Sequence, residues 1–302
     1  MKKIHMLQQK EKNYFKGGII MEEKKIVKKI EEGMDPQDVL CTTYQMRNFY
    51  MQFRDGFFSN LDVMNYIQHH AVALMAKKGM NVVDVCCGRS LVLPLLRYYA
   101  RNINSYTGVD ICETNIREAK RGASAKVLKE EDLEEYYPFK TDWILSNVAE
   151  MSNHIEKDFA DLIIYTSALE HMHKDVGTQS LIECHKIMNK DSVMFLSCPN
   201  TPGNGYETQY AAHVYEWGYD ELKEKLNELG FEIINEVGLV MKVKKMKEFF
   251  SSDKVSKDMQ DFYNKMSLYM PSAWLSTIVS IPYPKESDEI LFIVKKKSKK
   301  LF

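Results

Sequence analysis

Short apolar segments that alternate with helical segments constrain the fold of this chain more than any other feature. Over about 150 residues, strand-like runs rich in Val, Ile and Leu recur, and segments of helical periodicity separate them. Parallel strands need such crossover helices. Runs as apolar as LIIY (162–165) and VMFLS (193–197) fit a sheet that is buried on both faces. The sequence therefore predicts an α/β protein with a mostly parallel sheet and helices on both faces.

The expected elements follow from this periodicity and from the turn residues between the runs. Strands are expected at 81–86, 106–111, 143–146, 160–165, 192–197, 231–237 and 289–295. Helices are expected at 60–78, 91–100, 113–121, 177–188, 219–229 and, as one long stretch, 242–269. The segments 1–33 and 36–54 also have helical character, and the second carries an aromatic stripe.

Charge and cysteine content limit the class of protein. Lys plus Arg number 41 against 42 Asp plus Glu, so the whole molecule offers no electrostatic attraction for nucleic acid or anionic membranes. No apolar run is long enough to span a bilayer, and no secretory segment follows Met1. The six cysteines form no C-x-x-C pair, and no Cys/His cluster has zinc spacing. We therefore expect a cytoplasmic location, no membrane partner and no bound metal.

Small and acidic residues stand where the first two strands of the predicted sheet end. The first strand runs into D-V-C-C-G-R-S (84–90), a turn of small residues in which Gly88 tolerates unusual backbone angles. The second ends in G-V-D, which places Asp110 26 residues after Asp84. An acid at this position can accept two hydrogen bonds from a ribose diol, and ligands of such sheets bind at the carboxyl ends of the strands. A nucleotide or nucleoside site is therefore expected there.

These segments, in this order, resemble the class I S-adenosylmethionine (SAM)-dependent methyltransferases. The turn stands where that family usually has D-x-G-x-G-x-G, with Cys86 and Ser90 in place of glycines, and G-V-D-I matches its ribose-binding acid. FADLIIYTSALEHM and SVMFLSCPNTPG resemble the fourth-strand segment and the fifth-strand S-x-P-N signature of the small-molecule branch, and HVYEWGYDELKEKLNELGFEI resembles the segment that follows. The resemblance covers roughly 80–240 and 289–297. It implies a Rossmann-like sheet of seven strands and SAM as cofactor.

Carried over residue by residue, the resemblance implies a cofactor site. Asp110 is expected at the ribose. Asn147 stands where the family usually has an Asp at the adenine amino group, and its side-chain oxygen can accept the same hydrogen bond. The other expected cofactor-binding residues are Asp84, Cys86, Gly88, Ile111, Val148 and Thr166. An NAD-binding domain, or a sheet without a nucleotide, is the alternative, although the G-x-G-x-x-G spacing is absent.

Two histidines are the candidate catalytic residues. Methyl transfer from a sulfonium is a displacement that depends on alignment of the acceptor. A general base helps when the acceptor is a hydroxyl or a protonated amine, and histidine titrates near neutrality. His171 follows the fourth strand, and His213 lies in a loop after the fifth, so both are expected at the cofactor crevice. The alternative for His171 is a structural role, in which Glu170 and His171 hold the loop or helix that follows the fourth strand in place.

Aromatic segments outside the core suggest how the chain is organised. We expect an N-terminal helical extension or lid (1–59), a SAM-binding core (60–240), a helical insertion that forms an acceptor lid (241–288), and the last strand with a basic tail (289–302). A lid excludes water from the transferring methyl group. Tyr44, Arg47 and Tyr50 are the expected substrate-binding residues of the first lid.

The function expected from these features is methyl transfer to an oxygen or nitrogen of a small molecule, such as a sugar or a specialised metabolite. A nucleic-acid methyltransferase is the first alternative; the balanced charge and the absence of an N-P-P-Y motif count against it. A non-catalytic protein with the same fold is the second, because the D-V-C-C-G-R-S turn is irregular. The expected partner is the small-molecule acceptor, and the chain is compatible with a homodimer.

Overall fold

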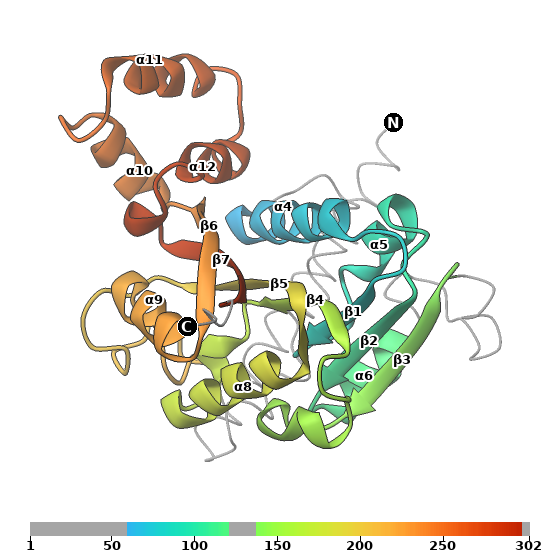
Figure 1. The fold of residues 1–302 in the computed structure, drawn as a ribbon. Helices are drawn as coiled ribbons and strands as arrows, with labels where there is room; N and C mark the ends of the chain where they lie inside the picture. The colour runs from blue at the N-terminus through green and yellow to red at the C-terminus, as the bar shows by residue number, and fades with distance from the viewer. Residues whose placement is uncertain (1–58, 121–136, 298–302) are drawn as a thin grey trace, which may run out of the picture.

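A seven-stranded sheet organises the protein (Figure 1). The computed structural model describes residues 59–120 and 137–297. The strand order is β3-β2-β1-β4-β5-β7-β6; β1 to β5 pair in parallel, and β7 pairs antiparallel with β5 and β6. The strands are β1 (Asn81–Val85), β2 (Ser105–Asp110), β3 (Lys140–Leu145), β4 (Ala160–Thr166), β5 (Met188–Pro199), β6 (Phe231–Val240) and β7 (Glu289–Lys296). The prediction of a mostly parallel, seven-stranded Rossmann-like sheet is confirmed.

Helices cover both faces of the sheet, and each face has its own hydrophobic core. Along β1 the side chains alternate, so that Val83 and Val85 enter one core and Val82 enters the other. In Figure 1, α4 lies above the sheet and α8 and α9 lie below it. The first core packs against α8 (Lys174–Ile187), α9 (Tyr219–Glu228) and the 3-10 turn η1 (Val148–Asn153); the second packs against α4 (Asn60–Met75), α5 (Leu93–Tyr99) and α6 (Glu113–Lys120).

Helix α4 begins at a capping box that its sequence encodes. The Ser59 side chain accepts a hydrogen bond from the backbone N–H of Asp62, and the Asp62 carboxylate accepts one from the backbone N–H of Ser59 at 2.7 Å. The helix then buries Met64, Val72 and Ala73 against the second core. This anchored helix brings the polar residues of its buried face to the carboxyl end of β4, beside the site described below.

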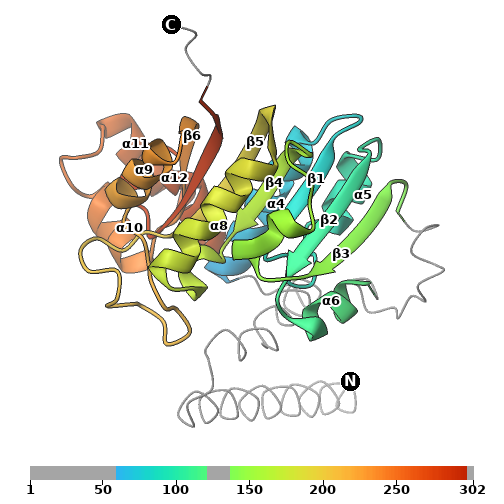
Figure 2. The same ribbon diagram turned by 60° about the horizontal axis from the view of Figure 1, so that its bottom comes forward.

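Strand β6 leads into an insertion of three helices before β7. The helices are α10 (Val243–Phe250), α11 (Lys257–Met266) and α12 (Ser272–Ser280), and Figures 1 and 2 show them at the end of the sheet that carries β6. The expected helical insertion is confirmed, and the helical stretch expected over 242–269 is divided into two helices, α10 and α11. The chain turns after Phe250, and Ser256 caps a new helix by accepting from the Met259 N–H.

The insertion has a hydrophobic cluster of its own. Phe250 is buried, and its ring stacks on Tyr263 at a centroid distance of 4.8 Å. Met241, Leu275 and Val279 complete the centre of this cluster. Helix α12 also packs against α4 and β6, so the insertion is attached to the second face of the core.

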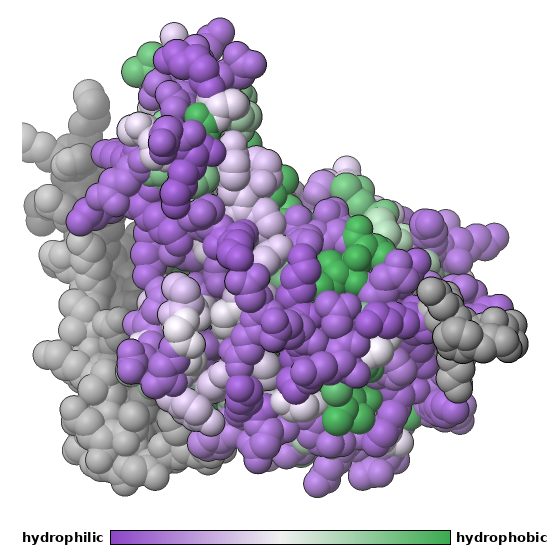
Figure 3. Space-filling model, turned by 60° about the vertical axis from the view of Figure 1, so that its left-hand side comes forward, coloured by the Kyte–Doolittle hydropathy of each residue, from purple (hydrophilic) through white to green (hydrophobic). Residues whose placement is uncertain are grey.

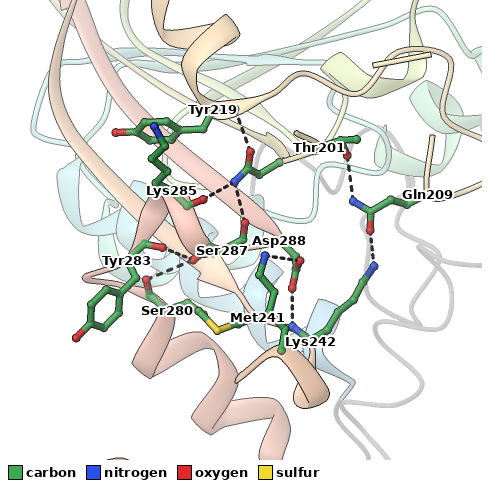
Figure 4. Close-up of polar contacts among 12 residues, drawn as sticks. Thr201, Gln209, Tyr219, Met241, Lys242, Ser280, Tyr283, Lys285, Ser287 and Asp288 are labelled. Atoms are coloured by element: carbon green, nitrogen blue, oxygen red, sulfur yellow. Dashed lines mark hydrogen bonds and ion pairs between the residues drawn. The ribbon is translucent and has the colours of Figure 1, made fainter. Parts of the chain in front are cut away.

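A polar network ties the root of the insertion to the loop after β5 (Figure 4). The Asn200 side chain donates to the carbonyl oxygens of Lys285 and Ser287 at 3.1 and 2.9 Å, and accepts from the Tyr219 N–H at 2.9 Å. The Asp288 carboxylate accepts from the Lys242 N–H at 2.6 Å. Asn200 is the last residue of the S-x-P-N signature, and its buried side chain connects three segments that are distant in sequence.

Some expectations concern residues outside the described ranges. Tyr44, Arg47 and Tyr50, with the rest of the expected N-terminal lid up to residue 58, are among them. Within the described ranges, the helices are too short or too polar to cross a bilayer.

Candidate active site

The turn after β1 keeps a glycine-like backbone although two of its three glycine positions hold other residues. Cys86, Gly88 and Ser90 have φ values of 56°, 52° and 55°, in the left-handed region that glycine adopts most easily. Side-chain contacts stabilise this turn: the Ser90 hydroxyl accepts from the Trp143 indole N–H at 3.0 Å. The substitutions at Cys86 and Ser90 therefore leave the shape of the turn intact.

Asp110, the last residue of β2, lies directly beside this turn. Its Oδ2 accepts from the Gly88 N–H and its Oδ1 from the Cys112 N–H, both at 2.8 Å. Burial raises the pKa of Asp110, and these backbone hydrogen bonds oppose that rise. A carboxylate has about four acceptor positions. The two backbone bonds thus fix the orientation of the Asp110 carboxylate and leave acceptor capacity for hydroxyl donors.

Apolar and polar neighbours extend this site. Ile111 is 53% exposed although it follows the buried Asp110, and Leu145 at the end of β3 is 52% exposed. Exposed aliphatic side chains at a strand edge provide a surface on which a planar base can pack. Asn147 is exposed and caps η1, its Oδ1 accepting from the Ala149 N–H at 2.9 Å. The Val148 side chain is buried in the first core, so only its backbone faces the edge of the sheet.

Asp84 occupies a different environment from the one expected of a ligand-binding residue. Its carboxylate is buried below the turn and accepts from the Tyr106 hydroxyl at 2.6 Å. Burial raises the pKa of Asp84 to about 7, and the hydrogen bond from Tyr106 opposes the rise. In this arrangement the Asp84 carboxylate connects β1 to Tyr106 of β2, whereas the Asp110 carboxylate binds the Gly88 N–H of the turn.

Two residues of α4 reach the ends of β4 and β5, and sequence reasoning missed them. His69 Nε2 lies 3.3 Å from the hydroxyl of Thr166, and the Gln68 Oε1 accepts from the Ser197 hydroxyl at 2.7 Å. Both side chains are buried. They lie 97 and 129 residues from these partners, so no local spacing in the sequence could reveal the contact.

The structure brings His171 and His213 together after β4 and β5. Their rings meet edge to face at a centroid distance of 4.9 Å. The Glu170 carbonyl oxygen anchors the second loop by accepting from the backbone N–H groups of Val214 and Tyr215 at 2.8 and 3.2 Å. Both histidines therefore lie after the carboxyl ends of these two strands.

Glu216 is a further residue that the sequence did not single out. Its Oε1 lies 2.5 Å from His213 Nδ1 and accepts from the Gln209 N–H at 2.8 Å. Its other oxygen accepts from the Thr201 hydroxyl, and the side chain is fully buried. A carboxylate held in this way fixes the ring orientation of His213.

Burial controls the protonation of this cluster. It lowers the pKa of His171 to about 4 with help from His213, and it also lowers the pKa of His213 against the opposing effect of Glu216. Burial and the neighbouring Glu216 carboxylate raise the pKa of Glu170. Both imidazoles are consequently neutral at neutral pH, and a neutral imidazole can accept a proton or donate a lone pair.

The residues of the β1 and β2 ends fit an adenosyl group. Asp110 offers oriented carboxylate oxygens for ribose hydroxyls, Gly88 offers a turn that a ligand can approach, and Ile111 offers an apolar surface beside them. The two ends lie next to the β1–β4 junction, where the strand order reverses and where ligands of such sheets bind.

Structures of known proteins share this fold. A SAM-dependent methyltransferase from Archaeoglobus fulgidus aligns with a TM-score of 0.50 and 17% identity, over 82% of this chain and 99% of that protein. The YcgJ protein of Bacillus subtilis aligns with a TM-score of 0.50 and 11% identity, over 78% of this chain and 100% of its own. The [4+2]-cyclase SpnF also aligns with a TM-score of 0.50 and 14% identity, over 76% of this chain and 80% of that protein. These similarities show the fold.

The family follows from a sequence comparison. No curated protein matches the chain in sequence. A family model described as a methyltransferase domain matches residues 63–236, which is more than half of the 302 residues. The match spans β1 to β5 and both histidines, and thus contains the whole candidate site. The chain therefore belongs to the methyltransferase domain family, and it is a SAM-dependent methyltransferase with a Rossmann-like fold and SAM as its cofactor.

Proposed function

We propose that this enzyme transfers the methyl group of SAM to an oxygen or nitrogen atom of a small-molecule acceptor. The observation that carries the proposal is the group of Glu170, His171, His213 and Glu216 at the carboxyl edge of the sheet, in which both carboxylates are buried and both imidazoles are half-buried. SAM supplies a methyl group on a positively charged sulfur. The chain must then hold an acceptor heteroatom in line with that methyl group and manage its proton or its lone pair.

Each part of the site has a proposed role. Asp110 accepts hydrogen bonds from the ribose, Asn147 and the Val148 backbone contact the adenine, and the exposed Ile111 side chain packs against the base. Cys86, Gly88 and Thr166 line the crevice by their positions at the strand ends, and Asp84 supports the turn below. His171 and His213 act on the acceptor heteroatom, and Glu170 and Glu216 orient them.

The helices α10 to α12 are proposed as the acceptor lid. Within this insertion, helix α12 makes the contact with α4. Helix α4 in turn carries Gln68 and His69 to the ends of β4 and β5. Figure 3 shows the side of the molecule on which the insertion projects; this side is predominantly hydrophilic, with separate apolar patches. Such a surface fits a lid whose outer side is in contact with water.

Incubation of the purified protein with a metabolite extract and methyl-labelled SAM tests the proposal. Mass spectrometry should find label in a small molecule, and His213→Asn should abolish that labelling while SAM binding is preserved. The matched control is His173→Asn, which replaces an exposed histidine two residues after His171. Label that enters only RNA or DNA, with a steep dependence on salt concentration, would show that the acceptor class is wrong.

A further inference from the structure

We propose that Glu170, His171 and His213 bind a divalent transition-metal ion, and that this ion holds the acceptor. The inference rests on the proposed function and specifies how the cluster acts. One ligand atom from each of the three residues lies within 4.8 Å of the others. A Glu170 carboxylate oxygen is 3.9 Å from His171 Nε2. Bonds from zinc to nitrogen and oxygen are about 2.0–2.2 Å, so the ligand atoms need to close by roughly 1 Å around an ion.

The two imidazoles are oriented as metal-binding histidines usually are. His213 Nδ1 lies 2.5 Å from the Glu216 carboxylate, and His171 Nδ1 lies 3.2 Å from the carbonyl oxygen of Ala212. Both partners are hydrogen-bond acceptors, so each Nδ1 is the protonated nitrogen and each Nε2 carries the lone pair. Metal-binding histidines characteristically donate their other N–H to a carboxylate or a backbone carbonyl, which fixes the tautomer and the ring.

The Glu170 carboxylate supplies an independent indication. Its side chain is almost fully buried, with a relative exposure of 2%. Among the described residues, no hydrogen-bond partner reaches its Oε2. A buried carboxylate oxygen without a partner destabilises the folded protein, because it loses its hydrogen bonds to water and gains none in return. A cation beside Glu170 removes that cost, and neither histidine needs to move far to reach the same ion.

The donor set indicates the class of ion. Two imidazole nitrogens and one carboxylate suit zinc, manganese and iron in the divalent state, whereas magnesium and calcium prefer sites made of oxygen ligands alone. Three protein ligands also leave coordination positions open. An acceptor oxygen or nitrogen can occupy an open position and so be held at the edge of the cofactor crevice.

Sequence spacing did not predict this site, because its three ligands do not form a local motif. Glu170 and His171 are adjacent, and His213 follows 42 residues later, in a loop whose position depends on the Glu170 carbonyl oxygen. The two hypotheses for His213 assign different roles to its Nε2: a general base accepts a proton there, and a metal ligand binds the ion there. A measurement of metal binding therefore distinguishes the two hypotheses.

The test is metal binding by the full-length chain after treatment with a chelator. Titration with Mn²⁺, followed by electron paramagnetic resonance, and with Zn²⁺, in competition with a chromophoric chelator, should each show one site per chain. Glu170→Gln and His171→Asn should weaken binding at least tenfold, and Glu216→Gln about 10–100-fold. The control His173→Asn should bind like the parent. Circular dichroism and thermal melting establish that each variant is folded.

Three results would overturn the proposal. The first is a parent protein that binds neither ion stoichiometrically. The second is a folded Glu170→Gln variant whose affinity equals that of the parent. The third is methylation of the acceptor at an unchanged rate after the metal has been removed. This result would show that the ion does not hold the acceptor. None of these results affects the proposed methyl transfer itself, because SAM binding and label transfer are measured separately.

Discussion

At the scale of single residues, the cofactor turn depends on contacts that hold an unusual backbone. Cys86 and Ser90 stand at glycine positions and still adopt positive φ values. Non-glycine residues in this region cost about 1–2 kcal/mol each. The hydrogen bonds of Gly88 and Ser90 to Asp110 and Trp143 offset part of that cost. The irregular D-V-C-C-G-R-S turn is thus compatible with the shape of the family motif.

Gly108 makes a close contact that this turn requires. A methyl group on Gly108 would lie 2.8 Å from Cys87 Sγ and 2.9 Å from the Trp143 ring. We expect Gly108→Ala to destabilise the protein by about 1–3 kcal/mol, as overpacking of a tight core does, and to weaken SAM binding by displacing the turn. Denaturant unfolding and calorimetry measure the two effects. Gly108→Ala/Cys87→Ala should recover only part of the loss; full recovery would show that Trp143 does not constrain the site.

Asp84 should make stability depend on pH. Its pKa is about 7 in the folded protein against an ordinary value of 3.8, so the folded state retains a proton that the unfolded state loses between these values. The stability due to this group is therefore complete below about pH 4 and falls as the pH rises to 7. Asp84→Asn keeps an acceptor for Tyr106 without the charge. Relative to the parent, this variant should gain stability in urea unfolding between pH 5 and pH 8; a constant difference would contradict the assignment.

At the scale of elements, the insertion α10–α12 and the loop after β5 are coupled through one amide. The Asn200 side chain joins β5, the N-terminus of α9 and the segment that returns from α12 to β7. This explains in physical terms why an Asn ends the S-x-P-N signature in this chain. An amide can both donate and accept, and these three hydrogen bonds of the Asn200 side chain are all to backbone groups.

Replacement of Asn200 should loosen the insertion. Asn200→Asp keeps the acceptor for the Tyr219 N–H but loses the two donated bonds, and each backbone group left unsatisfied in a buried site costs about 1–3 kcal/mol. We expect faster hydrogen exchange in 281–288 and at the start of β7, with little change in β1 and β2. Asp191→Asn, at an exposed position, is the control. Equal protection in Asn200→Asp and the parent would show that this network does not hold the insertion.

Hydrophobic periodicity and turn residues predicted most of the helices and strands, and the differences from the structure have physical causes. The expected strand over 231–237 and helix over 219–229 are confirmed as β6 and α9, because periodicity and the Gly230 turn are local signals. The helical stretch expected over 242–269 is interrupted, because serines around residues 251–256 allow a break that a separate hydrophobic cluster then stabilises. Apolar spacing alone cannot distinguish one long helix from two short ones that share a core.

At the scale of the whole molecule, the sheet topology explains what could be predicted of the site. Ends of parallel strands converge at one edge, so Asp110 and the two histidines could be placed there from the order of motifs. Gln68, His69 and Glu216 could not, because their partners depend on how α4 and the loop after β5 pack in three dimensions. The finer division of the chain into core and lids remains a prediction.

The most direct measurement of the central claim is calorimetric binding of SAM and S-adenosylhomocysteine to the full-length protein and to Asp110→Ala. The account predicts one site per chain, and a loss of at least tenfold in affinity for both ligands in Asp110→Ala, with Asp191→Asn unchanged. A folded Asp110→Ala protein that binds both ligands as tightly as the parent would contradict it.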